Sequence, residues 1–563
     1  MNEINPGLLI ILGALLVPVL PGLLRSAYML ALPVAVFLYL LGLPMGELGQ
    51  FEMFDMTLTT LRIDKLSLIF GYIFLLATFI GVIYALHVGD WLQHTTGLMY
   101  AGAAIGAVFA GDLITLFVCW ELTAIASVFL IWAAGTKSAH DAGMRYLIIQ
   151  VASGVILLAG IVFFYRETGG IAFNAIGIDT LAGKIILVAF GIKCAFPFMH
   201  NWLQDAYPEA TVTGTVMLSA FTTKLAVYAL ARGYAGTDLL IPIGTVMTAF
   251  PIFYAVIEND LRRVLAYSLN NQLGFMVVGI GIGTEMAVNG AAAHAFCHIL
   301  YKALLFMSMG AVLYRVGTVK GSELGGLYRS MPWTAGFCMV GAASISAFPL
   351  FSGFVSKSLI MTEALKGGYF YVWLTLLFAS AGVFHHSGIK IPYFAFFAHD
   401  SGKRCKEAPM NMLIAMGIAA FFCIGIGVYP APLYAILPYS VDYVPYTVEH
   451  VVTQLQLLMF SALAFAVLMR TGIYPPELRS TNLDTDWFYR KLGYNVGSTL
   501  LLLGGDAVKF VAAQGGNAFR VFERRLHFHH NPDGLFGRTW PTGLMAFWAT
   551  VMLGGYLLVF YFR

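Results

Sequence analysis

Residues 195–198 read Ala-Phe-Pro-Phe, and residues 347–350 read Ala-Phe-Pro-Leu. Each motif interrupts an unusually long apolar stretch, which covers 183–207 in the first case and 333–365 in the second. Proline lacks a backbone N–H and clashes with the preceding turn, so both stretches are expected to be helices broken in the middle. They are the seventh and twelfth apolar stretches of the chain, which gives them opposite directions across a membrane. Paired broken helices are typical of an inverted repeat that surrounds a transport pathway.

The composition of the whole chain also indicates a membrane protein. Of the 563 residues, 59% are hydrophobic and only 11% are charged. Soluble domains carry about 25% charged residues, so the composition excludes a soluble enzyme and a disordered chain. The net charge of +3 gives no reason to expect a nucleic-acid partner. The six cysteines follow no metal-binding spacing, which predicts single buried thiols and no metal, cofactor or disulfide.

Apolar stretches with almost no charge predict an all-α polytopic membrane protein with about 16 transmembrane helices. The stretches are 6–24, 27–44, 66–87, 96–111, 113–133, 143–165, 183–207, 211–231, 239–257, 264–284, 286–314, 333–365, 370–398, 411–437, 451–469 and 541–561. The first stretch has no basic segment before it, so we expect it to remain as a helix rather than to be cleaved as a signal peptide.

The distribution of Lys and Arg between alternate loops predicts the orientation. One set of loops holds eleven of them and the other set holds seven, while segment 470–538 adds nine to the richer set. The positive-inside rule then places the richer set in the cytoplasm and both termini outside the plasma (inner) membrane. Stretch 45–65 is expected to be an external loop, and its acidic residues fit that side: Glu47, Glu52, Asp55 and Asp64.

Segment 470–538 differs from the spans on either side of it. Its apolar part, 496–515, is rich in glycine and interrupted by Asp506 and Lys509, which predicts an amphipathic helix at the membrane surface. A solvated loop is expected to follow it, containing His527, His529 and His530, for which a metal site is the alternative interpretation.

Charged residues inside the predicted spans are few, and all five basic ones are lysines: Lys193, Lys224, Lys302, Lys357 and Lys390. A desolvated lysine can release its proton, whereas arginine stays protonated, so this choice favours a proton path over a voltage sensor. The alternative is that the amines reach out to the interface, which we apply to Lys390 at the end of its span. Glu121 is the one carboxylate near the middle of a span. We expect it to pair with a lysine as part of a proton switch, and a purely static ion pair is the alternative.

Two histidines share a predicted helix with one of these lysines. His294, His298 and Lys302 recur every four residues, which makes a stripe about 12 Å long on one helix face. Imidazole titrates near neutrality, so the stripe favours a proton relay over a metal site, for which no third ligand is evident. His385 and His386 are weaker candidates for the same path. The polar side chains of a neighbouring span add capacity for water: Tyr267, Ser268, Asn270, Asn271 and Gln272.

Six ordered motifs resemble those of a known family. They are 117–122 around Glu121, 191–206 around Lys193, 223–228 around Lys224, 260–268, 298–306 and 351–357. Together they resemble the antiporter-like subunits of Mrp cation/proton antiporters and of the proton-pumping arm of respiratory complex I, most of all the D-type subunit of Mrp. The resemblance covers about residues 60–440 and implies a core of about fourteen helices, with two inverted repeats of about five helices and breaks in helices 7 and 12.

The resemblance also implies roles for single residues and a division of the chain. Protons would enter near the seventh and eighth helices and leave through the twelfth, along Glu121, Lys193, Lys224, His294, His298, Lys302 and Lys357. Lys390 is not among the family's path residues. The implied division is 1–95 for three N-terminal helices, 96–235 and 236–400 for the two repeats, 401–470 for two more helices, 471–538 for the amphipathic segment and 539–563 for a last helix. The extension 451–563 is similar to the lateral-helix tail of the most distal antiporter-like subunit of complex I.

The sequence therefore favours a proton-translocating subunit of a multi-subunit Na⁺ or K⁺/proton antiporter, in contact with lipid and with other membrane subunits. Such a subunit is a transporter without chemistry of its own. One alternative is a pump module of a redox-driven complex, such as a dehydrogenase or a hydrogenase, where it would count as a translocase. The others are a proton-coupled partner of an inorganic-carbon uptake complex and a membrane anchor without transport.

Overall fold

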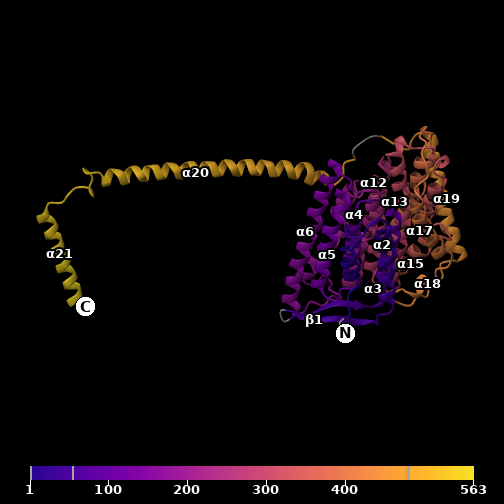
Figure 1. The fold of residues 1–563 in the computed structure, drawn as a ribbon, viewed down its shortest axis with the longest axis horizontal. Helices are drawn as coiled ribbons and strands as arrows, with labels where there is room; N and C mark the ends of the chain where they lie inside the picture. Colours follow the sequence, from indigo (N-terminus) through magenta and orange to yellow (C-terminus); the bar gives the residue numbers. More distant parts are fainter. Residues whose placement is uncertain (1–2, 54–55, 476, 479–481, 563) are drawn as a thin grey trace. The chain divides into compact units, whose positions relative to one another are not determined.

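The computed structural model describes residues 3–53, 56–475, 477–478 and 482–562. The chain divides into two units, Met1–Asn482 and Leu483–Arg563. The first unit is a bundle of helices that run alongside one another (Figure 1). Within the described residues, twelve helices of the chain are long and apolar enough to cross a membrane. The all-α polytopic class is therefore confirmed.

The helices of the bundle follow the predicted stretches closely. Up to the first break they are α1 (Pro6–Ala14), α2 (Gly22–Leu41), α3 (Lys65–Ala85), α4 (Trp91–Val108), α5 (Leu113–Trp132), α6 (Lys137–Thr168) and α7 (Leu181–Lys193). Up to the second break they are α8 (Asn201–Ala206), α9 (Val212–Ala220), α10 (Thr222–Gly233), α11 (Leu240–Ile257), α12 (Leu261–Ile282), α13 (Glu285–Val316), η1 (Gly321–Glu323), η2 (Leu327–Arg329) and α14 (Pro332–Ile345). After it come α15 (Ser352–Lys366), α16 (Phe370–Val383), η3 (Phe384–Lys390), η4 (Tyr393–Phe397), α17 (Met410–Val428), α18 (Ala431–Ala435) and α19 (Val448–Thr471).

Both predicted helix breaks are present, and they share one backbone conformation. Ala195 and Phe198 have positive φ angles of 60° and 68°, and Ala347 and Leu350 have 56° and 73°. Non-glycine residues rarely adopt this left-handed conformation, so the same pair of positions in both motifs marks a true structural repeat. Each break splits one span into two short helices, α7 with α8 and α14 with α15.

Two departures from the predicted helices were not signalled by proline motifs of this kind. The eighth stretch is interrupted at Phe221, between α9 and α10. The thirteenth changes from the α-helix α16 to the π-helical η3. In addition, the first stretch is helical only over Pro6–Ala14, and turns then lead to Pro18 and Pro21, which cannot continue a helix.

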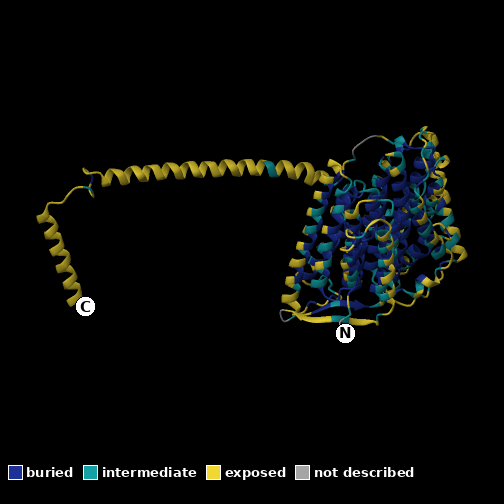
Figure 2. Cartoon of the chain, in the orientation of Figure 1, coloured by how far each residue is buried: buried dark blue, intermediate teal, exposed yellow. Residues whose placement is uncertain are grey.

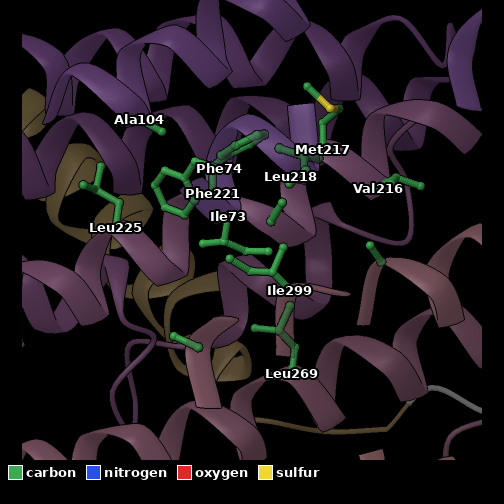
Figure 3. Packing of buried hydrophobic residues seen from close by; sticks show 14 of the residues in the cluster. Ile73, Phe74, Ala104, Val216, Met217, Leu218, Phe221, Leu225, Leu269 and Ile299 are labelled. Carbon is green, nitrogen blue, oxygen red and sulfur yellow. The ribbon is translucent and has the colours of Figure 1, made fainter. Parts of the chain in front are cut away.

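The break at Phe221 is stabilised by aromatic packing in the middle of the bundle. The Phe221 ring lies 5.2 Å from the rings of both Phe74 and Tyr100, and Figure 3 shows it beside Phe74 and Leu218. The Tyr100 hydroxyl accepts the Thr222 N–H at 2.9 Å, which satisfies a donor that the break removes from the helical ladder. The packing therefore explains an interruption that the sequence pattern does not reveal.

The inner helices of the bundle are buried and its outer helices are partly exposed (Figure 2). Val188, Phe253 and Phe421 are among the exposed apolar residues. A continuous apolar exterior is suited to lipid, which fits the membrane prediction. All six cysteines are free, as predicted; Cys119 and Cys405 are half-buried and the other four are buried.

The loops gather at two opposite ends of the bundle. At one end, Arg262 donates to the backbone carbonyls of Pro208 and Ala210, and Asn259 donates to Ser322. These contacts join loops of the Lys- and Arg-rich set, and we call this end the basic face. The N-terminus and strand β1 lie at the other end (Figure 1), which we call the hairpin face.

Stretch 45–65 is not the loop that the sequence predicts. Strands β1 (Gly46–Met53) and β2 (Met56–Ile63) form an antiparallel hairpin that pairs Gly46 with Ile63 and Met53 with Met56. Leu58, Leu61 and Ile63 of β2 are buried against the end of the bundle, so β2 covers the core there. Asp55, which was counted among the loop's acidic residues, lies outside the described residues.

Asp64 fastens the hairpin to the bundle and carries a pH-dependent prediction. It accepts the Ser67 N–H at the start of α3 and pairs with Arg232 of α10 at 2.8 Å. Burial raises the pKa of the Asp64 carboxyl, but Arg232, Ser67 and Arg62 outweigh it, so the pKa is lowered. A lowered pKa stabilises the fold above the unfolded-state pKa of about 3.9, and the contribution is lost as the pH falls further.

Asp64→Asn should lower the free energy of unfolding at neutral pH by about 1 kcal/mol or less, and the melting temperature should fall accordingly. This deficit should shrink below about pH 3.9. An equal deficit at every pH would contradict the ion-pair explanation.

The second unit consists of η5 (Phe488–Gly493), α20 (Tyr494–His530) and α21 (Thr542–Tyr561). Helix α20 has 37 residues, about 55 Å at 1.5 Å per residue, well beyond the ~30 Å hydrocarbon core. His527, His529 and His530 lie in its last turn, so the predicted loop there is wrong: the helix continues through them. The unit's helices are exposed along their length (Figure 2), and their interfacial placement stays a prediction.

Candidate functional site: a buried row of lysines and histidines

Lys193 is the last residue of α7, directly before the first helix break, and is fully buried. Its ammonium group donates to the Trp120 carbonyl at 2.5 Å and to the Thr123 hydroxyl at 2.7 Å, both on α5. It also lies 4.4 Å from the centre of the Trp120 ring, which favours a cation. The break ends α7 where this amine can reach across to α5.

Glu121 lies on α5 next to these groups, but it does not hydrogen-bond to Lys193. Its Oε1 atom is buried and has no hydrogen-bond partner among the described residues. It faces Gly154 of α6, where an added Cβ atom would collide with the carboxylate. The predicted direct pair is therefore not formed in this structure, because Thr123 and the Trp120 carbonyl occupy the amine instead. The two groups still interact electrostatically.

Lys224 is fully buried near the start of α10, three residues after the break at Phe221. Its amine donates to the Ser219 carbonyl at 2.6 Å. This carbonyl belongs to the last turn of α9, where the interrupted helix leaves acceptors without a partner. The lysine thus donates to a carbonyl that the break leaves without a helical partner.

The predicted stripe of His294, His298 and Lys302 lies on α13, and all three residues are fully buried. The His294 ring contacts the Ser356 hydroxyl at 3.0 Å and the Gln272 side-chain oxygen at 3.2 Å. Neither ring nitrogen of His298 has a hydrogen-bond partner among the described residues. The same holds for the Lys302 amine. Buried polar groups are almost always satisfied in proteins, so these three nitrogens set this part of α13 apart from an ordinary helix core.

Lys357 lies on α15, after the second break, and is bound in the same way as Lys224, by a carbonyl at the end of the preceding helix. Its amine donates at 2.7 Å to the carbonyl of Ile345, the last residue of α14. It borders a cavity of about 200 Å³ that reaches Lys366 near the hairpin face and includes His450 and Gln454 of α19. The last lysine of the row therefore borders open space rather than only packed side chains.

Lys193, Lys224 and Lys357 share a chemical property: each amine is held by neutral backbone carbonyls or hydroxyls. A carbonyl accepts a hydrogen bond from an ammonium or from a neutral amine, so neither protonation state is locked in. Lys302 in addition experiences the charges of Lys224 and Lys357. Because like charges disfavour each other, protonation of one amine weakens protonation of the next. Such a row can pass a proton from one amine to the next, and its amines are not all protonated at the same time.

Lys390 contradicts the prediction made for it. Its side chain is fully buried and does not reach out to the interface. The amine donates to the carbonyls of Val256 and Glu258 at the end of α11 and pairs with Glu477 at 2.9 Å. Desolvation at this depth is offset only because several oxygens surround the amine, which the sequence spacing alone could not show.

Three further residues take part in the row and were not singled out from the sequence. Tyr301 donates to Gln272 at 3.1 Å and lies beside both histidine rings. Ser356 holds His294, and Gly154 makes room for Glu121. The spacing of Tyr301, one residue before Lys302 and seven after His294, is a weak signal that could have indicated the first of them.

Comparison with known proteins places the same region in a family. A family model described as NADH:quinone oxidoreductase/Mrp antiporter, transmembrane, matches residues 110–385, which contain the whole row. The D-type subunit of the Na⁺/H⁺ antiporter of Alkalihalophilus pseudofirmus is 31% identical over 313 residues, covering 52% of this chain and 63% of that protein. The N-type subunit of the NADH-quinone oxidoreductase of Desulforudis audaxviator is 30% identical over 352 residues, covering 57% and 69%.

The solved structures agree with this fold. A chain of the Mrp complex from Dietzia sp. DQ12-45-1b matches with a TM-score of 0.76 at 23% identity, over 88% of this chain and 59% of that one. The chain thus spans less than two thirds of the length of the Na⁺/H⁺ antiporter relative and of the matched Mrp chain.

Proposed function

We propose, from the premise that this chain belongs to the NADH:quinone oxidoreductase/Mrp antiporter family of transmembrane subunits, that it translocates protons within a monovalent cation/proton antiporter. The observation that carries the proposal is the fully buried group of His298 and Lys302, whose side-chain nitrogens have no hydrogen-bond partner among the described residues. An anchor or a static scaffold has no use for such groups, because leaving a polar group buried and unpaired costs about 1–3 kcal/mol.

The proposed path uses the residues of the row in order. A proton enters beside Glu121 and Lys193, passes Lys224, crosses His298, Lys302 and His294 on α13, and leaves from Lys357. Each amine in contact with a carbonyl can hold the proton or release it, and repulsion between neighbouring amines moves it on. The cavity of about 200 Å³ beside Lys357 supports release toward the hairpin face.

The wider assignments follow from this path. We place the basic face in the cytoplasm and the chain termini outside the plasma membrane, and we assign the two repeats to 96–235 and 236–400. In this division, residues 1–95 supply three helices before the repeats, and residues 401–470 supply two helices after them. Other membrane subunits are the proposed partners, through 471–538 and 539–563 among other surfaces. The matched Mrp chain belongs to a complex, which supports such partners.

The exchanged cation is proposed to be Na⁺ or K⁺, by analogy with the Na⁺/H⁺ antiporter relative. A second candidate function rests on the relative that belongs to an NADH-quinone oxidoreductase. In that case the same proton row serves a redox-driven pump. The subunits that purify with the chain distinguish the two, since a redox pump requires iron–sulfur partners.

The test is proton exchange in inside-out membrane vesicles that contain the intact complex and lack other antiporters. A respiratory substrate first acidifies the vesicles, and a fluorescent dye reports the pH gradient. Addition of Na⁺ or K⁺ should release protons and collapse part of the gradient. The absence of a response to both cations, together with iron–sulfur subunits in the purified complex, would replace the antiporter by the redox pump.

A further inference from the structure

Lys390 lies at the centre of a buried charged cluster that the proton row does not use. Its amine is within hydrogen-bond distance of the carbonyls of Ala255, Val256 and Glu258, at 3.2, 2.6 and 2.7 Å. The Glu477 carboxylate is 2.9 Å away. Glu258 is also buried, and its carboxylate accepts N–H groups from Asn259, from Asp260 and from Asn482. One carboxylate thus pairs directly with the buried lysine, and the second interacts with it electrostatically.

A cavity at the basic face leads to this cluster. It has a volume of about 330 Å³, and Glu477 lines it together with Ser322, His399 and Tyr474. Glu477 Oε2 has no hydrogen-bond partner among the described residues, so the carboxylate has a free acceptor in the cavity region. Burial raises the pKa of the Glu477 carboxyl, against the opposing effect of Lys390. The carboxyl therefore exchanges protons closer to neutrality than an exposed glutamate does.

On its inner side the cluster continues along η3. His386 precedes Lys390 by four residues, about one turn of this helix, and is fully buried. Its Nδ1 atom lies 2.9 Å from the Ser387 hydroxyl, which donates to Ser268 of α12 at 2.7 Å. The Nε2 atom of His386 has no hydrogen-bond partner among the described residues.

His386 brings the cluster within electrostatic reach of the row. Among charged side chains, Lys302 interacts with His386 most strongly, ahead of His385, Lys390 and Lys357. The charged and polar groups thus form a sequence from the cavity inward: Glu477, Lys390, His386 and then Lys302. The π-helical turn matters here, because such turns are frequent at functional sites and this one points both His386 and Lys390 into the bundle.

We propose that this cavity and cluster form a second proton entrance, from the basic face through Glu477, Lys390 and His386 to Lys302. The inference rests on the proposed function of the row and adds an entrance to it. Protonation of Glu477 from the cavity breaks its ion pair with Lys390. The ammonium group then gives a proton to Nε2 of His386 and takes the proton from Glu477, which restores the pair. The second half of the row is then supplied without passing Lys193 and Lys224.

A cap for α11 is the alternative role of Lys390, because its amine binds the last carbonyls of that helix. A cap alone requires neither Glu477 nor His386. The experiment therefore leaves Lys390 unchanged and alters its neighbours, using Glu477→Gln, His386→Gln and the double variant in vesicles with the intact complex. The matched control is Glu407→Gln, a carboxylate at the basic face that accepts the Trp333 N–H and the Thr334 hydroxyl and has no link to the cluster.

Each single variant should lower the exchange rate per assembled complex by roughly 3- to 10-fold. This is less than the ~100-fold or more typical of losing a sole proton-transfer group, since the first entrance remains. The double variant should be no slower than the slower single variant, because both residues serve one route. The control should exchange at the natural rate.

Two results would overturn the second entrance. One is an exchange rate in His386→Gln equal to that of the unmodified complex, whatever the thermal stability of Glu477→Gln. The cluster would then only stabilise the fold. The other is a double variant whose loss is the product of the single losses. Lys224→Ala, measured in parallel, separates the failures: if it abolishes exchange while His386→Gln does not change it, only the entrance is wrong and the row remains.

Discussion

Lys224→Ala combined with His386→Gln is expected to abolish proton exchange, reducing the rate by about 100-fold or more, because the two changes close both proposed entrances. Lys224 is the amine between the first break and the α13 stripe, and in the proposed path a proton from Lys193 reaches Lys302 through it. Alanine offers no site for the proton at this position of the row. The measurement is cation-driven proton release in vesicles with the intact complex, normalised to the amount of assembled complex.

The control for Lys224→Ala is Lys137→Ala, which removes an exposed amine at the start of α6. It should exchange at the natural rate, because it is not part of the row. Lys224→Ala also leaves the Ser219 carbonyl without its partner, so the complex is checked by size-exclusion chromatography. An assembled complex that carries both Lys224→Ala and His386→Gln and still exchanges protons would contradict the assigned path.

Lys302→Met is expected to remove transport while leaving the fold as stable as before, or more stable. The Lys302 amine is fully buried and has no hydrogen-bond partner among the described residues, so it contributes no bond that methionine would lose. An unpaired buried polar group costs about 1–3 kcal/mol, and methionine of similar length removes that cost. The exchange rate should fall to background, and the melting temperature of the purified complex should hold or rise.

Lys357→Met provides the comparison for Lys302→Met. It also removes a row lysine, but it leaves the Ile345 carbonyl at the helix break without a donor. Its melting temperature should therefore fall while its transport is lost. A fall in melting temperature for Lys302→Met, with transport retained, would show that Lys302 is a structural residue.

The sequence predicted the elements of the bundle well, because apolar length and charge scarcity are properties of single spans. The Ala-Phe-Pro motifs located both breaks, and the structure shows the same positive φ angles in each. The break at Phe221 and the π-helical turn η3 were missed, since they depend on packing against other helices: Tyr100 supports the first, and η3 adjoins α11 and α12. The hairpin was missed because stretch 45–65 has no apolar run long enough for a span and was therefore taken as a loop. The burial of Leu58 and Leu61 depends on packing against the end of the bundle.

Residue types in the row were predictable, but their contacts were not. Buried lysines and histidines stand out in an apolar sequence whatever surrounds them. Their partners are mostly backbone carbonyls, such as those of Trp120, Ser219 and Ile345, which any residue could supply. For this reason Glu121 lacks the hydrogen-bonded lysine that the sequence led us to expect. Lys390 was misjudged because Glu477, its partner, lies 87 positions away in the chain.

Proton release by the complex that carries Lys357→Arg tests the central claim most directly. The cavity of about 200 Å³ beside Lys357 leaves space for a guanidinium group, which can still donate to the Ile345 carbonyl. Arginine keeps the positive charge but does not give up its proton in proteins. If protons pass through this amine, cation-driven proton release should fall to background although the complex assembles normally. A natural rate in Lys357→Arg would show that the row only needs charge there and that protons do not travel through it.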